Sequence, residues 1–208
     1  MALTEANRAG EFLLAEGNGY YSREEVTLVA NSGALVAGTV LGKITKAGTA
    51  SAVAFAGNTG DGAMGAITVG AGAMAGVYKL VITEPGTNVG NFIVEGPDGV
   101  VIGQGDVGSA FSAGGLSFTL ADGAADFVAG DGFNITVAAG SGKYKPYNNA
   151  NTDGSETAVA ILYAPAVNSA ADQAVAVIAR HAEVDGNLLT GNDANGTADL
   201  AAVGIIVR

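Results

Sequence analysis

Two apolar runs near the carboxyl end of the chain constrain its fold more than any other feature. The first runs from Thr157 to Tyr163 and the second from Ala174 to Ala179, and a break centred on Pro165 separates them. Short runs rich in β-branched residues and bounded by turn residues are typical of buried strands. Because two strands alone are marginally stable in water, these two need partners. The candidates lie more than 100 residues upstream, between Val26 and Ile44, so we expect the two ends of the chain to form one β body.

The composition changes between these two ends. Residues 49–141 carry eight acidic residues and one basic residue, Lys79, a net charge of −7. The flanks carry −1 (residues 1–48) and −3 (residues 142–208), which completes the −11 of the whole chain. Six of the seven phenylalanines lie in the middle segment, whereas five of the six tyrosines lie outside it. A segment with its own charge balance and aromatic usage is expected to fold by itself, so we predict an inserted domain.

The middle segment has an all-β pattern. Its candidate strands alternate polar and apolar residues, as half-buried strands must, and they recur at roughly 8–12 residues. Pro97-Asp98-Gly99 is a turn signal, because Pro presets φ and Gly accepts a positive φ. These features predict a small sandwich or barrel. The candidate strands are Ala66 to Val69, Val77 to Thr83, Asn91 to Glu95, Val100 to Ile102, Leu116 to Leu120 and Phe133 to Val137.

Residue types that are absent or scattered argue against several classes of protein. Cysteine is absent, so disulfides, thiolate metal sites and cysteine nucleophiles are ruled out. Lys and Arg are scattered in an acidic chain, so nucleic acid is not an expected partner. The start, MALTEANRAGEF, lacks a basic region followed by an apolar one, and we expect no signal peptide. No apolar run approaches the roughly 20 residues of a membrane-spanning helix, so no membrane partner is expected.

Residues 1–19 allow two interpretations. Apolar Leu3, Phe12, Leu13 and Leu14 lie among polar residues, and three glycines leave little room for a helix. In the first interpretation the segment is a frayed terminus, as terminal residues commonly are. Alternatively, the cluster of Phe12, Leu13 and Leu14 belongs to an arm that adds a strand to the sheet edge of another chain.

Residues 103–108 (GQGDVG) match the glycine pattern of a dinucleotide-binding turn and follow a candidate strand. Such a site requires a helix directly afterwards, whose amino end holds the pyrophosphate. The next residues, SAFSAGG, form helices poorly, and a second strand follows. We therefore interpret these glycines as turn residues between strands.

Asp122, Asp126 and Asp131 offer carboxylate oxygens of the kind that calcium prefers. They lack the spacing of an EF-hand, and Asp-Gly pairs are ordinary turn residues. We expect turns here and no metal.

His181 is the only histidine of the chain. A catalytic imidazole needs a nucleophile and an orienting acid close in space, and neither a nucleophile elbow nor a second histidine is present. An enzyme centred on His181 is the weakest hypothesis. A structural histidine at a strand end, hydrogen-bonded to Glu183 or to backbone, is the preferred interpretation.

Seven segments of the two flanks carry a family pattern, in this order: Leu3-Thr4-Glu5, Ser22-Arg23-Glu24, Ala37 to Ile44, Gly142-Lys143-Tyr144, Asp153 to Leu162, Val177 to Val184, and Gly204 to Val207. With this content and order, the flanks resemble the head decoration proteins of tailed bacteriophages, of the lambda D-protein type. The middle segment is absent from the shortest members and departs from the pattern.

The resemblance implies a mainly β fold with a β-clip type core, no enzymatic activity, and no cofactor or metal. It implies a homotrimer at local threefold positions on the outer surface of the capsid, made in the bacterial cytoplasm, which stabilises the shell against DNA pressure. The implied domains are an arm (residues 1–19), a core (residues 20–48 plus 142–208) and the inserted β domain (residues 49–141). The arm residues implied to bind the major capsid protein are Leu3, Thr4, Glu5, Phe12, Leu13 and Leu14.

A second hypothesis assigns the function to the insert. It would be a binding module for carbohydrate or for a host surface, mounted on the capsid by the flanks. Sugar sites favour exposed aromatic side chains, and Tyr78 and Phe111 are the candidates.

Overall fold

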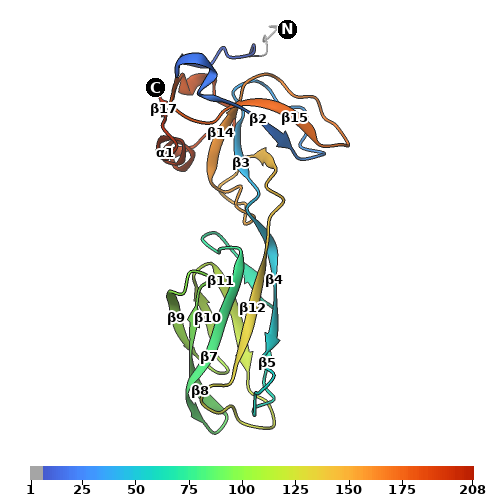
Figure 1. Cartoon of the computed structure of the whole chain (residues 1–208), viewed down its shortest axis with the longest axis vertical. Helices are drawn as coiled ribbons and strands as arrows, with labels where there is room; N and C mark the ends of the chain where they lie inside the picture. The colour runs from blue at the N-terminus through green and yellow to red at the C-terminus, as the bar shows by residue number, and fades with distance from the viewer. Residues whose placement is uncertain (1–6) are drawn as a thin grey trace, which may run out of the picture. The chain divides into compact units, whose positions relative to one another are not determined.

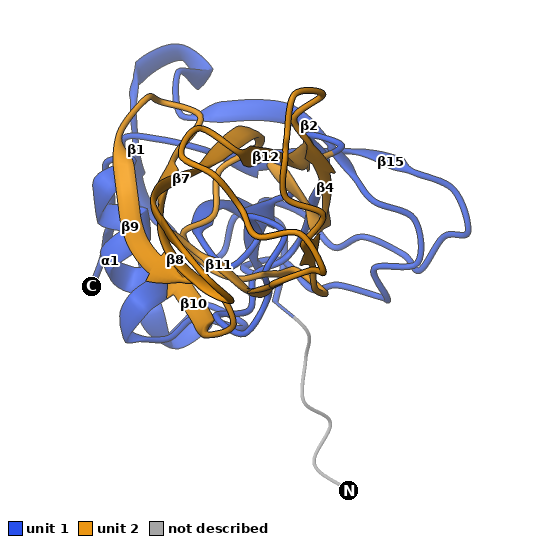
Figure 2. Ribbon diagram, turned by 90° about the horizontal axis from the view of Figure 1, so that it is seen from below, with its two compact units in different colours: residues 1–44, 141–208 blue, residues 45–140 orange. Residues whose placement is uncertain are grey.

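The computed structural model describes residues 7–208, which form two compact units that are each rich in β-strands. Unit 1 contains both ends of the chain, up to residue 44 and from residue 141 onward, and unit 2 contains residues 45–140 (Figure 2). The expected mainly β fold is confirmed.

A closed five-stranded barrel forms the centre of unit 1 (Figure 1). In spatial order its strands are β13 (Tyr144–Pro146), β2 (Arg23–Leu28), β15 (Gln173–Ile178), β14 (Ala158–Leu162) and β3 (Val40–Lys43). The antiparallel pairing of β15 with β2 is continuous, and β14 joins β15 to β3. The predicted pairing between the two ends of the chain is therefore confirmed. Leu28, Leu41, Leu162 and Val177 are fully buried inside this barrel.

A three-stranded sheet and a helix complete unit 1. The sheet contains β1 (Leu13–Glu16), β16 (Ala182–Val184) and β17 (Ile205–Val207), in that order. Strand β1 runs antiparallel to the central β16, and β17 runs parallel to it. The helical segments are the 3₁₀ turns η1 (Asn18–Tyr20) and η2 (Gly186–Leu188) and the helix α1 (Ala194–Ala202). One apolar cluster joins barrel, sheet and helix, and it includes Phe12, Ile161, Val184, Leu200 and Ile205.

A tyrosine fixes the amino end of α1 to the rest of unit 1. Asp193 caps the helix by accepting a hydrogen bond from the Gly196 amide at 2.7 Å. The buried Tyr147 hydroxyl donates to the same carboxylate at 2.8 Å. Burial, followed by this carboxylate, raises the pKa of Tyr147 to about 12, so the hydroxyl remains a donor over the ordinary pH range.

Unit 2 is an all-β body, as the sequence predicts. Its strands are β4 (Lys46–Ala54), β5 (Ala63–Met64), β6 (Thr68–Val69), β7 (Gly76–Gly86), β8 (Val89–Glu95), β9 (Val101–Asp106), β10 (Ala110–Ala113), β11 (Leu116–Ala121) and β12 (Gly132–Ala139). They are hydrogen-bonded in the order β10-β11-β6-β4-β12-β7-β8-β9, and β5 pairs with β11. Each of the six candidate strands is present, but β4, β5 and β10 were not predicted.

Aromatic side chains fill the interior of unit 2. The rings of Phe92, Phe111 and Phe118 lie 4.8–6.1 Å apart between centroids. Such separations are typical of interacting aromatic pairs in protein cores. Tyr78 is also fully buried, and its hydroxyl interacts with the backbone of Met74.

The glycine motif at residues 103–108 serves this core. Gly103 and Gly105 belong to β9, and Gly108 adopts φ +82° in the turn before β10. A Cβ atom on Gly105 would lie 2.7 Å from the ring of Phe92, closer than carbon atoms approach one another. A strand and no helix follows the motif, which confirms a structural role over a dinucleotide site. The interpretation as turn residues holds for Gly108 but was wrong for Gly103 and Gly105, which lie within a strand.

We predict that Gly105→Ala destabilises unit 2 by about 1–3 kcal/mol, since the added methyl group must displace the Phe92 ring from a filled core. Gly57→Ala is the matched control, because a Cβ atom there meets nothing within 4 Å. Calorimetric unfolding of both variants checks the prediction. Equal stability of the two variants would contradict it.

Candidate docking face of the amino-terminal sheet

The predicted arm residues occupy different environments. Leu3, Thr4 and Glu5 lie outside the described residues. Phe12 is fully buried, Leu13 packs partly against the same cluster, and Leu14 is 57% exposed. The assignment of Phe12 to a free arm therefore needs correction: its ring belongs to the core of unit 1. Of the three residues in the predicted apolar cluster, Leu14 is the one that offers most of its side chain to a partner.

Backbone contacts hold the segment around β1 in place. The Gly10 amide donates to the Tyr163 carbonyl at 2.9 Å, and the Asp185 amide donates to the Phe12 carbonyl at 2.8 Å. At the far end of β1, the Ser22 hydroxyl accepts from the Gly17 amide and donates to the His181 carbonyl, each at 2.8 Å. The described part of the terminus is thus an integral strand of unit 1.

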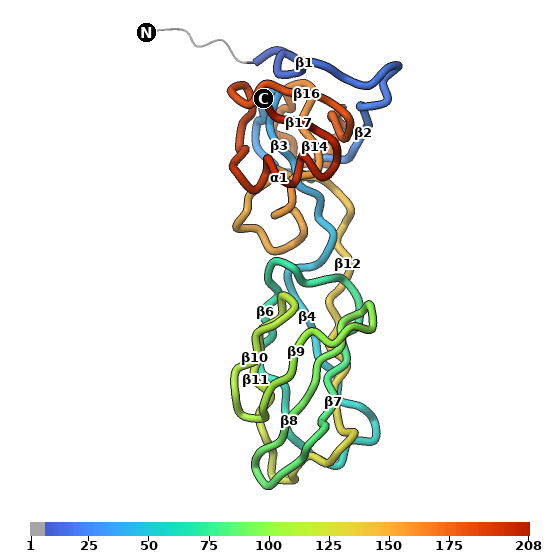
Figure 3. The backbone as a smooth tube through the Cα atoms, turned by 90° about the vertical axis from the view of Figure 1, so that its left-hand side faces the viewer, coloured from blue at the N-terminus to red at the C-terminus, as the bar shows by residue number. Residues whose placement is uncertain are grey.

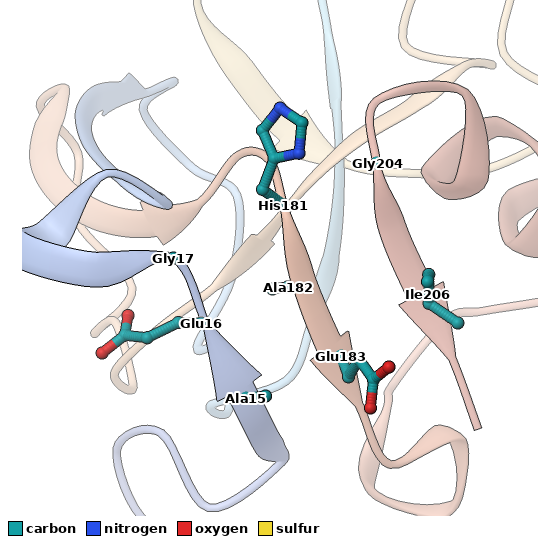
Figure 4. Close-up of a pocket in the computed structure, with 8 residues that line it drawn as sticks. All are labelled: Ala15, Glu16, Gly17, His181, Ala182, Glu183, Gly204 and Ile206. Atoms are coloured by element: carbon teal, nitrogen blue, oxygen red, sulfur yellow. The ribbon is translucent and has the colours of Figure 1, made fainter.

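The outer face of the three-stranded sheet is exposed to solvent at several positions. Ala15, Glu183 and Ile206 lie side by side across the three strands, and Ile206 is 46% exposed. A groove of about 340 Å³ follows this face (Figure 4). It is lined by Ala15, Glu16, Gly17, His181, Ala182, Glu183, Gly204 and Ile206. We call this surface, together with the adjacent Leu14, the docking face.

His181 stands at one end of the groove, immediately before β16, as predicted for a histidine at a strand end. Its side chain is exposed, and its ring lies 5.4 Å from that of Tyr21. Of the two alternative hydrogen-bond partners predicted for His181, Glu183 is not the one found: its carboxylate accepts from Arg208 at 2.8 Å. The backbone of His181 does form hydrogen bonds, through its carbonyl oxygen, with Gly17 and Ser22. The imidazole thus lies beside the Tyr21 ring, with the two ring planes tilted by 31°.

Both acids that line the groove of the docking face form ion pairs. Arg23 donates twice to Glu16, at 2.7 and 2.8 Å, and the hydrogen bond to Arg23 lowers the pKa of Glu16 despite an opposing effect of burial. Arg208 pairs with Glu183 at 2.8 Å.

Arg180 and Glu24 form a third ion pair. The Arg180 guanidinium also lies over the Tyr21 ring, 5.5 Å from its centroid. Each of these three arginines therefore has a carboxylate of the same chain as its partner.

Strand β1 lies at the end of unit 1 opposite the connection to unit 2 (Figure 3). The chain leaves unit 1 after Ile44 and returns at Ser141. There, the Ile44 amide donates to the Lys143 carbonyl and the Gly142 amide donates to the Ile44 carbonyl, both at 2.9 Å. The leaving and returning segments are thus already joined as neighbours within unit 1.

Two of the three aspartates considered for calcium have separate structural roles. Both carboxylate oxygens of the buried Asp131 accept backbone hydrogen bonds, and Asp126 accepts one from the Asn88 amide at 2.8 Å. Within residues 7–208, no three His, Asp or Glu side chains converge as metal ligands would. The structure thus supports the interpretation of Asp131 and Asp126 as residues that fix loops.

The aromatic residues proposed for sugar binding are in the core. Tyr78 is 0% exposed and Phe111 is 4% exposed. Both prefer the interior because they lie on the inward-facing side of alternating strands, where their rings contribute to the packed cluster of unit 2. The assignment of these two residues as a glycan platform was wrong.

Comparisons with known proteins identify one family. The model of the family "bacteriophage lambda head decoration protein D" matches residues 2–205. No curated protein matches the chain. Two crystal structures of FlgL from Xanthomonas campestris, in space groups H3 and C2, align with 51% of this chain at 20% and 21% identity and a TM-score of 0.35.

The aligned part spans 34% and 33% of the two FlgL chains, about a third of their length. A TM-score this low carries no structural argument. Nor does any helix among the described residues have the length and apolar character needed to cross a bilayer.

Proposed function

The chain belongs to the family of bacteriophage lambda head decoration protein D, and we propose that it is a cement protein of the phage head. In this proposal a homotrimer binds the outer surface of the capsid at local threefold positions and stabilises the shell against the pressure of packaged DNA. The observation that carries the proposal is the family match over nearly the whole chain. Synthesis in the bacterial cytoplasm, followed by addition to the assembled head, is part of the same proposal.

The docking face is the surface that we propose to meet the major capsid protein. It exposes the side chains of Leu14 on β1 and Ile206 on β17. Strand β1 is at the edge of its sheet, so its outer side is suited to pairing with a further strand. Residues 1–6, including Leu3, Thr4 and Glu5, precede this strand, and we propose that they contact the capsid as an arm.

Trimerisation would strengthen modest contacts at each docking face. Once one subunit of a trimer binds, the other two are held near their sites at high effective concentration. Matching the threefold symmetry of the lattice allows all three contacts to form together. Stabilisation of the shell follows because each trimer links neighbouring capsomers.

Cosedimentation with expanded, undecorated capsids tests the proposal. We expect saturable binding of the full chain, and binding at least about tenfold weaker after deletion of residues 1–6. This deletion leaves the buried Phe12 in place, so it removes the arm without opening the core. The mass of the free protein in solution checks the trimer. A full chain that does not bind capsids would end the proposal.

We propose that unit 2 is an insertion, and that the remaining flanks are a self-sufficient decoration core. Replacing residues 46–139 with an Asn-Gly turn is expected to leave unit 1 folded, because its hydrogen bonds between Ile44, Gly142 and Lys143 already bring the cut ends together. Calorimetry of this shortened variant should show one unfolding transition. Its midpoint temperature should equal that of the unit 1 transition in the full chain. Loss of that transition would show that unit 1 depends on unit 2.

A further inference from the structure

A groove of unit 1 that is separate from the docking face lies beside the point where the described chain begins. Its volume is about 320 Å³, and we call it the Tyr147 groove. Most of its lining side chains are apolar. The lining residues are Ala34, Leu35, Val36, Thr39, Val40, Pro146, Tyr147, Thr190 and Gly191.

Two of the polar groups in this lining are already used within unit 1. The Thr39 hydroxyl donates a hydrogen bond to the Val36 carbonyl at 2.8 Å. The Tyr147 hydroxyl donates to Asp193 at 2.8 Å, so its ring is the part that borders the groove. A concave site that is mainly apolar, and whose polar groups are satisfied by the protein, suits an apolar occupant.

Asn7, the first residue that the structure describes, is fixed at the near end of this groove. Its side-chain amide donates to the Leu188 carbonyl at 2.9 Å and to the Ala37 carbonyl at 3.4 Å. Ala37 directly follows Val36 of the groove, and Leu188 precedes Thr190 of the groove by two residues. Because consecutive Cα atoms lie about 3.8 Å apart, the groove begins within about 8 Å of these anchoring residues.

Residues 1–6 have the length and the apolar side chains needed to fill the groove. Their sequence is MALTEA, in which Met1 and Leu3 carry the large apolar side chains. Leu3 precedes Asn7 by four residues, which gives an extended chain a reach of roughly 13 Å. Because the arm is tethered at Asn7, its effective concentration at the groove is about millimolar, which favours it over separate partners in dilute solution.

We infer that residues 1–6 fold back in the free protein and seat Leu3 in the Tyr147 groove, and that they leave the groove when the arm contacts the capsid. The inference rests on the proposed function, which requires the same residues at the capsid surface. The groove then acts as an internal latch that keeps Leu3 from water until the capsid offers a better contact. Capsid binding therefore includes the free energy of releasing the arm.

Disulfide trapping tests where the arm lies, and the chain has no cysteine of its own to interfere. The test variant combines Leu3→Cys with Ala34→Cys, at an exposed position in the lining of the groove. A disulfide requires two Cβ atoms about 4 Å apart, so a seated arm links far more readily than a free one. The matched control combines Leu3→Cys with Ala201→Cys, at an exposed alanine of helix α1 outside the groove.

In oxidised glutathione, we expect the test variant to form an intrachain disulfide at least about tenfold faster than the control. The loss of free thiols gives the rate, and mass spectrometry identifies the product. Equal rates in the two variants would overturn the inference, because the arm would then have no preference for the groove. A linked product of twice the chain mass would also overturn it, since a second copy of this chain would then supply the occupant.

Capsid binding tests the release of the arm. We expect the oxidised test variant to bind expanded, undecorated capsids at least about tenfold more weakly than the same variant after reduction, because the disulfide holds the arm in the groove. Equal binding of the two forms would overturn the release step. Absence of capsid binding by the unmodified chain would end the proposed function, whereas the trapping rates would still decide whether the arm is seated.

Discussion

Replacing Phe12 with alanine is expected to lower the free energy of unfolding of unit 1 by about 3–5 kcal/mol, the usual cost of removing a large aromatic ring from a core. The ring is fully buried and packs in the cluster that joins the barrel to the sheet and helix α1. Its loss leaves a cavity among side chains from segments far apart in the sequence, which cannot all close in at once. Calorimetry of the full chain measures the effect as a lower transition temperature for unit 1, with the transition of unit 2 unchanged.

Leu14→Ala is the control, because this neighbouring side chain is mostly exposed and its loss should change stability by less than about 0.5 kcal/mol. Similar stability of the Phe12 and Leu14 variants would contradict the placement of Phe12 in the core. The result also decides how deletions of the terminus are interpreted. A deletion that includes Phe12 would impair capsid binding through loss of folding, whereas removal of residues 1–6 tests the arm alone.

The architecture of unit 1 follows from patterns visible in the sequence. The runs that become β14 and β15 are short and apolar, so they need partner strands to bury them. The sequence places these partners upstream, before residue 45, and β2 and β3 are the strands that pair with them. The strands of unit 2 are predictable where alternation is strong, as in β7, β8 and β11. Strand β4 escapes prediction because its sequence, KAGTASAVA, is dominated by small residues with weak β preference. Its extended conformation comes from pairing with β12.

The candidate site was predicted less completely than the fold. Phe12, Leu13 and Leu14 look alike in the sequence, but their environments differ because the chain turns at Phe12 and enters a sheet at Leu13. Partner strands from residues 182–184 and 205–207 make that difference, and local sequence does not specify them. Ile206 gives no signal for exposure either, since an apolar run near the end of a chain predicts burial. The ion pairing on the docking face is likewise a product of tertiary structure, as Arg208 and Glu183 lie 25 residues apart in the sequence.

Asp131 is the buried acid on which the loops of unit 2 depend. One carboxylate oxygen accepts from the Thr59 amide at 2.9 Å, and the other accepts from the amides of Gly60 and Val128 at 2.9 and 3.0 Å. Burial by itself would raise the pKa of Asp131, but these three hydrogen bonds outweigh it and hold the pKa below its usual value. The folded unit therefore prefers the ionised carboxylate more than the unfolded chain does.

Asp131→Ala is consequently expected to destabilise unit 2 by about 2–4 kcal/mol at neutral pH, because three amides lose a charged acceptor in a buried position. The contribution of the carboxylate is fully present above the pKa of aspartate in the unfolded chain and is lost as pH falls through the lower folded pKa. The free energy of unfolding of unit 2 should therefore differ between Asp131→Asn and the unmodified chain at neutral pH. This difference should become smaller as the pH falls below about 4. Calorimetry of unit 2 across that range measures both effects, with the exposed Asp106→Asn as control. A difference between Asp131→Asn and the unmodified chain that stays constant with pH would show that the carboxylate charge does not secure these loops.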